Sequence, residues 1–191
     1  ELDITDTDEV LNFGVINRPD VIINCAAVTD TDLCEKEPEL AYRVNALGAR
    51  NLSIVARKTG AKMVQISTDD VFDGIRHTPY TEFDDTNPKT VYGRSKRAGE
   101  NYVKEFTHKH FILRSNWVYG NGNNFVNRIL HAADTKDELL IASDQFGSPT
   151  SAKDLAKMIM YLISTNEYGT YHVTCRGVCS RYEFAQEILK L

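Results

Sequence analysis

The sequence has no long hydrophobic run and no concentration of positive charge. None of its apolar stretches approaches the roughly 20 residues that a membrane-spanning helix needs, and no polybasic stretch, membrane-surface helix or signal peptide is present. The 22 Lys and Arg residues are scattered among 27 Asp and Glu, which gives a net charge of −5. Because phosphate backbones are bound by clustered positive charge, we expect a cytoplasmic protein without membrane or nucleic-acid partners.

Cysteine and histidine are too scattered to predict a metal site or disulfides. Cys175 and Cys179 are separated by three residues rather than the two usual in a zinc knuckle, and no second Cys or His pair stands near them. Cys25 lies in an apolar pattern typical of a strand, where a small buried thiol is common. The five His residues show no ligand spacing either. We therefore expect free thiols and no protein-built metal site.

Short β-rich runs alternate with amphipathic stretches of helical length. This alternation predicts βαβ units, a mostly parallel sheet and a doubly wound, Rossmann-type α/β fold. Loops after strand ends, such as 69–90 and 116–124, lie at the edge where open α/β sheets bind ligands. The expected strands are 21–27, 63–67, 111–113, 139–142 and 170–174, and the expected helices are 38–58, 91–106, 125–133, 154–163 and 182–191.

Tyr92 and Lys96 are the strongest candidates for chemistry. They are four residues apart at the start of a predicted helix and therefore share one face. A phenol with a pKa near ~10 transfers protons poorly at neutral pH. A nearby ammonium lowers that pKa toward the range of efficient general acid–base catalysis. Taken alone, the pair is better explained as two solvated side chains, because Tyr-x-x-x-Lys is often found by chance.

Ser67 and Thr68 favour a catalytic role for Tyr92 and Lys96, because they stand at the end of a predicted buried strand upstream of that pair. Hydroxyl residues at a strand end usually serve only the following turn. Strand-end hydroxyls, then a loop, then Tyr-x-x-x-Lys opening a helix are a much rarer combination. Together they direct two hydrogen-bond donors, a hydroxyl and a phenol, toward one carbonyl oxygen.

These residues and several longer segments resemble the extended short-chain dehydrogenase/reductase family, and within it the dTDP-4-dehydrorhamnose reductases. The Asp-Gln-x-Gly-x-Pro-Thr stretch and the spacing from Ser67-Thr68-Asp69 to Tyr92 are specific to the reductase branch. The resemblance implies a single, incomplete nucleotide-binding domain over 1–191, with elements of a small C-terminal substrate lobe mainly from about 117–191. The matching segments follow the family order over nearly the whole chain: 2–6, 21–27, 66–69, 71–74, 91–96, 117–120, 122–126 and 144–150.

The resemblance also implies a role for each matching residue. Tyr92 would protonate the 4-keto oxygen of dTDP-4-dehydro-L-rhamnose while NADPH or NADH delivers hydride, which yields dTDP-L-rhamnose. Lys96 would hold the nicotinamide ribose and lower the pKa of Tyr92, and Thr68 would bind the keto oxygen or the phenol. Asp69 and Trp117 would contact the sugar. The implied cofactor-binding residues are Asp3, Ile4, Ala26, Ala27, Val28, Thr29, Tyr92 and Lys96.

Three features depart from the family pattern. The Gly-rich turn and first strand that cradle the pyrophosphate are missing, and the C-terminal part is short, so the chain reads as a fragment that should bind a dinucleotide poorly. Asp70 stands where this branch usually carries Tyr, and Asn116 replaces a Ser or Ala. The choice between NADH and NADPH cannot be read, and the oligomeric state, a homodimer included, stays open.

Two other functions fit parts of the pattern. A sugar-nucleotide dehydratase or epimerase would carry an Asp-Glu pair after the strand-end Thr, which Asp69-Asp70 partly mimics, and it would recycle its cofactor rather than consume it. A non-catalytic, dinucleotide-binding protein, similar to the regulatory subunit of methionine adenosyltransferase, would not need Thr68, Tyr92 and Lys96 together. Stoichiometric capture of an enzyme partner, together with no reduction of a ketosugar, would favour the regulatory protein.

Overall fold

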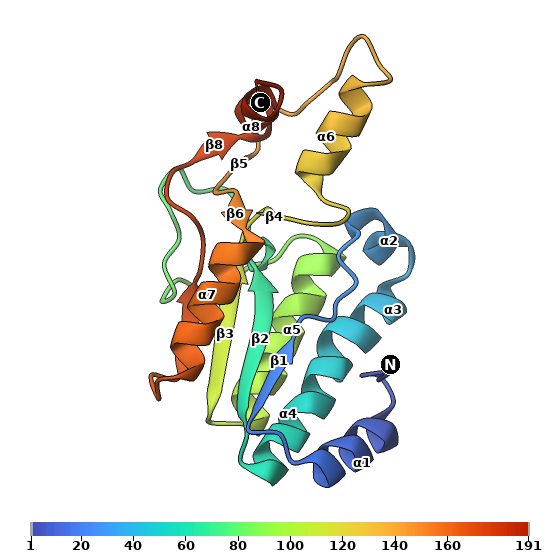
Figure 1. Ribbon diagram of the computed structural model, residues 1–191, viewed down its shortest axis with the longest axis vertical. Helices are drawn as coiled ribbons and strands as arrows, with labels where there is room; N and C mark the ends of the chain where they lie inside the picture. The colour runs from blue at the N-terminus through green and yellow to red at the C-terminus, as the bar shows by residue number, and fades with distance from the viewer. Residues whose placement is uncertain (1, 191) are drawn as a thin grey trace. The chain divides into compact units, whose positions relative to one another are not determined.

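The computed structural model describes residues 2–190, which divide into two compact units (Figure 1). The first unit contains the chain up to Arg114 and the segment Tyr161–His172. The second contains Ser115–Met160 and the chain from Val173 onward. The first boundary lies close to residue 117, from which we expected the substrate lobe to begin, and the role of the second unit as that lobe stays a prediction.

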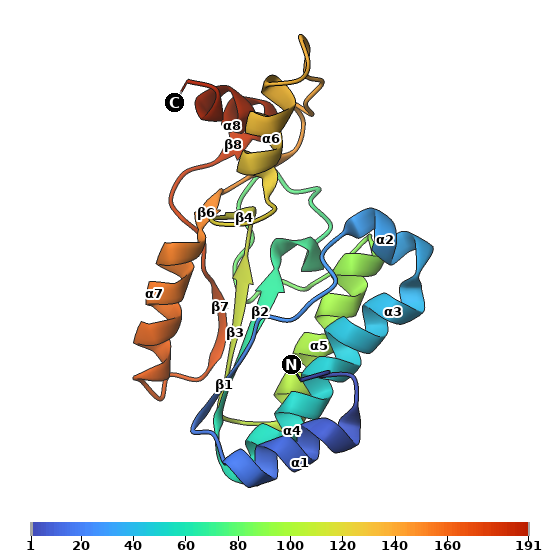
Figure 2. The ribbon, with the colours of Figure 1, turned by 45° about the vertical axis from the view of Figure 1, so that its right-hand side comes forward.

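A four-stranded sheet forms the centre of the first unit, in the order β1-β2-β3-β7 (Figure 2). β1 pairs in parallel with β2, and β3 pairs in parallel with β7. The predicted α/β fold with a parallel sheet is therefore confirmed. The strands are β1 (Val21–Asn24), β2 (Lys62–Thr68), β3 (His110–Ser115) and β7 (Gly169–His172).

The inner strands β2 and β3 are buried, whereas β1 is only partly covered. Met63, Val64 and Ile112 have no exposed surface, as expected of parallel strands covered on both faces. In β1, Ile23 is 44% exposed, and the thiol of Cys25 just beyond it is also exposed. The expected burial of Cys25 is therefore wrong, because β1 has a neighbouring strand on one side only among the described residues. All four cysteines are free thiols.

Helices α4 (Ala49–Thr59) and α5 (Val91–Phe106) pack against the sheet, and α1 (Thr7–Asn17) packs against α4 (Figure 2). The bounds of α5 agree with the prediction. Its start is fixed by Thr90, whose hydroxyl accepts a hydrogen bond from the backbone N–H of Gly93 at 3.0 Å. The sequence did not predict α1, because its apolar periodicity is weak, and only Val10 and Gly14 of this helix are buried. The short helix α2 (Thr31–Lys36) was missed as well.

The helix expected at 38–58 is present but interrupted. It begins as α3 (Pro38–Tyr42), widens into a π-helical turn at Arg43–Gly48 and continues as α4. Such π-helical turns are found mostly as single insertions and often at functional sites. The turn also approaches α5 closely, because a Cβ at Gly99 would lie 2.3 Å from the carbonyl oxygen of Asn45.

The second unit consists of short elements around a small apolar core. The helices α6 (Phe125–Ala133) and α8 (Arg181–Ile188) pack together through Ile129, Ala185 and Ile188. Its elements are β4 (Val118–Tyr119), α6 (Phe125–Ala133), β5 (Phe146–Gly147), β6 (Thr150–Ser151), β8 (Cys179–Ser180) and α8 (Arg181–Ile188). β4 and β6 pair in parallel, and β5 and β8 pair antiparallel. α7 (Ala152–Ile163) begins here and ends in the first unit.

The strand predicted at 139–142 is wrong. Leu139 and Ile141 are partly buried against the core of α6 and α8, while Leu140 between them is 99% exposed. The carbonyl of Ala142 accepts a hydrogen bond from the N–H of Tyr182 at 3.0 Å rather than from a neighbouring strand. The short apolar run therefore covers the small core as an irregular segment. In the described part of the chain, no helix has both the length and the apolar character to cross a membrane.

Gly99→Ala is expected to lower the free energy of unfolding of the chain by about 1–3 kcal/mol. At an unconstrained helix position the same change stabilises by about 1 kcal/mol, but here the added methyl group would collide with the Asn45 carbonyl. Urea denaturation measures the difference. Glu105→Ala, an exposed position of the same helix, serves as the control and should change stability by less than about 0.5 kcal/mol. A Gly99→Ala chain more stable than the wild type would contradict the close approach.

Candidate active site

Thr68 ends β2 and starts the short 3-10 turn Asp69–Val71. Its hydroxyl accepts a hydrogen bond from the N–H of Asp70 at 3.2 Å and donates to the carboxylate of Asp69 at 3.3 Å. The side chain is buried. Thr68 is thus fixed at the carboxyl end of a central strand, which is where ligands bind in open parallel sheets.

Tyr92 lies in the first turn of α5 and meets Thr68. The Thr68 hydroxyl lies close enough to the Tyr92 phenol to influence its pKa as a hydrogen-bonding group. The approach depends on Gly93, because a Cβ there would lie 2.1 Å from the carbonyl oxygen of Asp70. The start of α5 can therefore pack directly on the turn after β2. This contact brings together Thr68 and Tyr92, the two predicted hydrogen-bond donors.

Lys96 lies one turn further along α5 and is only 4% exposed. Its Nζ donates a hydrogen bond to the carbonyl oxygen of Ile66 in β2 at 2.7 Å. Burial lowers the pKa of Lys96 to about 8, and the nearby Glu100 and Cys25 oppose that change. Thr68, Tyr92 and Lys96, which the sequence singled out, are thus gathered around the end of β2.

The pKa of Tyr92 moves in the direction opposite to the sequence-based expectation. Burial raises it above the ordinary value of a phenol, and the carboxylates of Asp70 and Asp69 and the thiol of Cys34 add to the increase. The Thr68 hydroxyl works against this change. The expected lowering by Lys96 is therefore wrong for this structure, because desolvation is the largest influence on the phenol and Lys96 is not among the groups that shift its pKa. Tyr92 is a protonated phenol at neutral pH.

Asn45, in the π-helical turn, is a site residue that the sequence analysis missed. Its side-chain amide accepts from the N–H of Val28 at 2.9 Å and donates to the Val28 carbonyl at 3.0 Å and to the Ser95 hydroxyl at 2.9 Å. Asn45 thereby ties the loop after β1 to the helix that carries Tyr92 and Lys96. A polar residue in an apolar helical pattern was the signal that could have revealed it.

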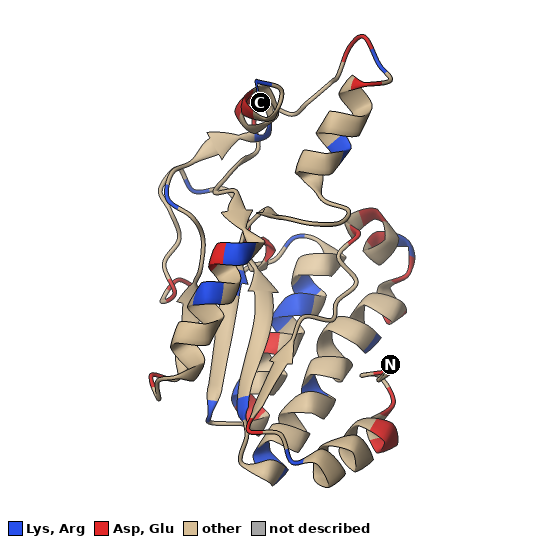
Figure 3. Ribbon diagram, viewed as in Figure 1, with Lys and Arg blue, Asp and Glu red and all other residues tan. Residues whose placement is uncertain are grey.

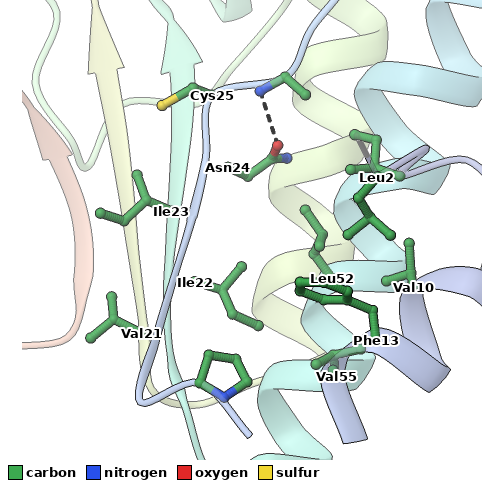
Figure 4. Close-up of a pocket in the computed structure, with 14 residues that line it drawn as sticks. Leu2, Val10, Phe13, Val21, Ile22, Ile23, Asn24, Cys25, Leu52 and Val55 are labelled. Carbon is green, nitrogen blue, oxygen red and sulfur yellow. Dashed lines mark hydrogen bonds between the residues drawn. The ribbon is translucent and has the colours of Figure 1, made fainter. Parts of the chain in front are cut away.

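The residues predicted to bind the cofactor lie in two places in the first unit. Tyr92 and Lys96 lie at the end of β2, and the others lie in or near the segments that border β1. Ile4 and Ala26 line an apolar groove of about 430 Å³ beside β1, together with Ile22 and Leu52 (Figure 4). Ala26 is held by a hydrogen bond from its N–H to the side chain of Asn24 at 3.1 Å, drawn in Figure 4. Ala27, Val28 and Thr29 continue this loop toward α2.

Asp3 has an exposed side chain, and its neighbours in sequence, Leu2 and Ile4, line the groove. The carboxylate accepts a hydrogen bond from the N–H of Thr5 at 2.8 Å. Hydrogen bonding to Thr5 lowers the pKa of Asp3, and Arg43 contributes in the same direction. The side chain is therefore anionic at neutral pH.

Trp117 belongs to the second unit and is half-buried in an aromatic cluster. Its ring stacks with that of Phe184 at 6.4 Å between centroids, and the Arg181 guanidinium lies 3.8 Å from the indole centroid. Such a short separation is typical of a cation–π contact. The backbone of Trp117 has a φ of 40°, an uncommon value for a residue other than glycine. The predicted sugar contacts of Trp117 and Asp69 stay predictions.

The parallel sheet, the buried lysine and the Thr–Tyr pair at a strand end define the class of the first unit. They are the features of a short-chain dehydrogenase/reductase. The family described as the RmlD substrate binding domain matches residues 1–191, and the chain belongs to that family.

Several individual proteins are similar to this chain. The spore coat polysaccharide biosynthesis protein SpsK of Bacillus subtilis is 47% identical over 174 residues, which cover 91% of this chain and 61% of that protein. The dTDP-4-dehydrorhamnose reductase of Escherichia coli is 40% identical over 174 residues, which cover 88% of this chain and 58% of the enzyme. The chain thus spans about three fifths of the length of these relatives.

Solved structures agree closely with the fold. A dTDP-4-dehydrorhamnose reductase from Clostridium acetobutylicum superimposes with a TM-score of 0.97 at 49% identity, covering 99% of this chain and 68% of that structure. The enzyme from Bacillus anthracis, solved in complex with NADP, gives a TM-score of 0.96 at 48% identity over the same shares of the two chains.

Lys96→Met is expected to raise the free energy of unfolding at pH 7 by about 1–3 kcal/mol, because a buried ammonium is costly. Below pH 8 the lysine is protonated in both the folded and the unfolded chain, so its cost is fully present. Between pH 8 and 10.5 the unfolded chain binds the proton that the folded chain has released, and wild-type stability rises with pH. The advantage of the variant should therefore shrink from pH 8 to 9.5.

Denaturant titrations at several pH values measure this difference. Lys136→Met, which removes an exposed lysine, is the control and should follow the wild type at each pH. An advantage of Lys96→Met that is absent at pH 7, or that is constant from pH 7 to 9.5, would show that the ammonium is not desolvated.

Proposed function

We propose that this chain forms the catalytic part of an NADPH- or NADH-dependent reductase. It reduces the 4-keto group of dTDP-4-dehydro-L-rhamnose and yields dTDP-L-rhamnose. The observation that carries the proposal is the grouping of Thr68, Tyr92 and Lys96 at the end of β2. Relatives named for this reaction, one of them solved with NADP, support it.

Tyr92 donates the proton in this reaction. Because burial raises its pKa, the phenol is fully protonated at neutral pH and can transfer its hydrogen to a ketone oxygen that is gaining negative charge. The dinucleotide, when bound, supplies the hydride to the carbon of the same carbonyl group. The proton lost from Tyr92 is replaced from solvent after the product alcohol has formed, so each turnover consumes one hydride and one proton.

Thr68 is proposed to polarise the ketone from the end of β2. Its oxygen is held by the N–H of Asp70, and its one hydrogen is donated to Asp69. A hydroxyl has a single donor hydrogen, so this hydrogen turns from Asp69 to the ketone oxygen when the substrate binds. Asp69, at the same strand end, is proposed to accept a hydrogen bond from a sugar hydroxyl, and the sugar contact of Trp117 stays a prediction.

The residues of the first unit fit a dinucleotide. The Nζ of Lys96 has three N–H groups, and one of them is given to Ile66, which leaves donors for the two ribose hydroxyls. The loop from Ala26 to Thr29 has small side chains and a backbone held by Asn45, so a flat ring can approach it closely. Asp3 and Ile4 are proposed to lie against the adenine. A cytoplasmic location and a homodimer remain predictions.

The direct test uses the extended protein, by which we mean a polypeptide of the relatives' full length that contains this chain. It is given dTDP-4-dehydro-L-rhamnose with NADPH or NADH, and the nicotinamide absorbance is followed. The expected result is one oxidised nicotinamide for each dTDP-L-rhamnose formed. Conversion of the sugar nucleotide without net nicotinamide oxidation would instead establish a dehydratase or epimerase. Absence of any conversion, with stoichiometric capture of an enzyme partner, would establish a regulatory protein.

Tyr92→Phe is expected to lower kcat of the extended protein by about 10²- to 10⁴-fold, because it removes the proton donor. Dinucleotide binding, measured by fluorescence titration, should change little. Tyr102→Phe alters a tyrosine of the same helix that packs against Phe106 and should retain wild-type turnover. A Tyr92→Phe protein that keeps its rate would refute the assigned role.

A further inference from the structure

A cluster of charged side chains around Glu100 and Arg114 is buried next to the candidate site, and the mechanism above does not use it. Its centre is Glu100 on α5, whose side chain has no exposed surface. The carboxylate accepts a hydrogen bond from the Ser67 hydroxyl at 2.6 Å, and it pairs with both Nε and Nη2 of Arg114, at 2.9 and 2.8 Å. Arg97 approaches the same carboxylate at 3.6 Å. The cluster therefore joins β2, α5 and β3.

The position of Glu100 connects the cluster to the site. Glu100 follows Lys96 by four residues, so both side chains leave the same face of α5, and Figure 3 shows basic and acidic positions adjoining on this helix. Ser67, the second partner, immediately precedes Thr68 in β2. One carboxylate thus braces the helix that carries Tyr92 and Lys96 against the strand that carries Thr68.

The cluster is not optimised for stability. The Nη1 of Arg114 is buried without a hydrogen-bond partner among the described residues, and such an unmet donor costs free energy. Buried ion pairs often contribute less to stability than apolar side chains of the same size. Arg114 also lies over the Phe72 ring, 5.1 Å from its centroid. A charge cluster with this cost is better explained by what it does for the neighbouring ammonium.

We propose that Glu100, held in place by Ser67 and Arg114, is a positioning residue that keeps Lys96 protonated and fixed against the end of β2. Without a nearby negative charge, a buried ammonium favours its neutral form, which can neither hold a ribose hydroxyl as a charged donor nor stabilise a tyrosinate. The consequence for catalysis, an alkaline limit of the reaction set by Glu100, rests on the proposed function.

The charged surroundings of Lys96 support this assignment. On its own helix Glu100 opposes the lowering of the Lys96 pKa, and from the end of β1 only Cys25 acts in the same direction. Asp69 and Asp70, in the turn after β2, and Cys34 of α2 act on Tyr92 rather than on Lys96. Arg114 faces Glu100 from β3. Among the described residues, Glu100 is therefore the carboxylate that acts on the buried ammonium, from one turn further along the same helix.

The test compares the double variant Glu100→Gln/Arg114→Met with the wild-type chain. Replacing both members of the pair avoids leaving an isolated buried charge. The titration of Lys96 is followed by NMR of the lysine ζ-nitrogens, and its signal is assigned by its absence from the Lys96→Met spectrum. The pKa of Lys96 should fall by about one pH unit. Glu105→Gln, which removes an exposed carboxylate of the same helix, should leave it unchanged.

If the double variant does not fold, Glu100→Gln and Glu100→Asp replace it. The glutamine keeps the hydrogen-bonding shape without the charge and should lower the Lys96 pKa, whereas the aspartate keeps the charge and should hold it near the wild-type value. A Lys96 pKa that stays within about 0.2 pH unit of wild type in every folded variant without the Glu100 charge, or that falls equally in Glu105→Gln, overturns the proposal.

In the extended protein, the alkaline limb of kcat/KM should move to lower pH together with the Lys96 titration. The two claims fail differently. If the extended protein reduces no ketosugar while the Lys96 titration still depends on Glu100, the proposed function is wrong and the positioning role stands. If reduction proceeds with an unchanged alkaline limb in the folded double variant, the positioning role is wrong and the function stands.

Discussion

The ammonium of Lys96 is almost fully removed from water, and most of the architecture around the end of β2 is a response to that burial. A desolvated cation needs a hydrogen-bond acceptor and a negative neighbour. The carbonyl of Ile66 supplies the first and Glu100 the second. Both are available because α5 packs against β2, and the start of α5 meets the turn after β2 so closely that position 93 must be glycine. The burial of one charge therefore determines which helix, strand and small residue must meet.

Burial also explains the protonation state of the phenol. In water a neighbouring ammonium would make Tyr92 more acidic, but inside the protein the loss of solvent dominates and the nearby carboxylates of the turn after β2 act in the same direction. The result is a fully protonated donor, which suits reduction of a ketone better than a partly ionised phenol. The chemistry of the site is thus determined as much by exclusion of water as by the identity of the three residues.

Much of the fold followed from local signals in the sequence. α5 and α6 have their predicted bounds, because Thr90 and Asn124 cap them and their apolar spacing is regular. Long-range packing was not readable in the same way. The run at 139–142 has the composition of a strand, yet it pairs with no strand among the described residues and covers a small core instead. The exposure of Cys25 and the direction of the Tyr92 pKa likewise depend on surrounding elements that no short window contains.

The site could be predicted where one segment carries several of its residues, as in the spacing of Tyr92 and Lys96. Asn45 and Glu100 were missed, because the hydrogen bonds that hold their side chains in place come from residues more than ten positions away in sequence. A further consequence comes from Trp117. It is the single tryptophan of the chain, it lies in the second unit, and a guanidinium covers its indole. Emission excited selectively in the indole band therefore reports on the second unit alone, so loss of order there can be observed separately from melting of the sheet.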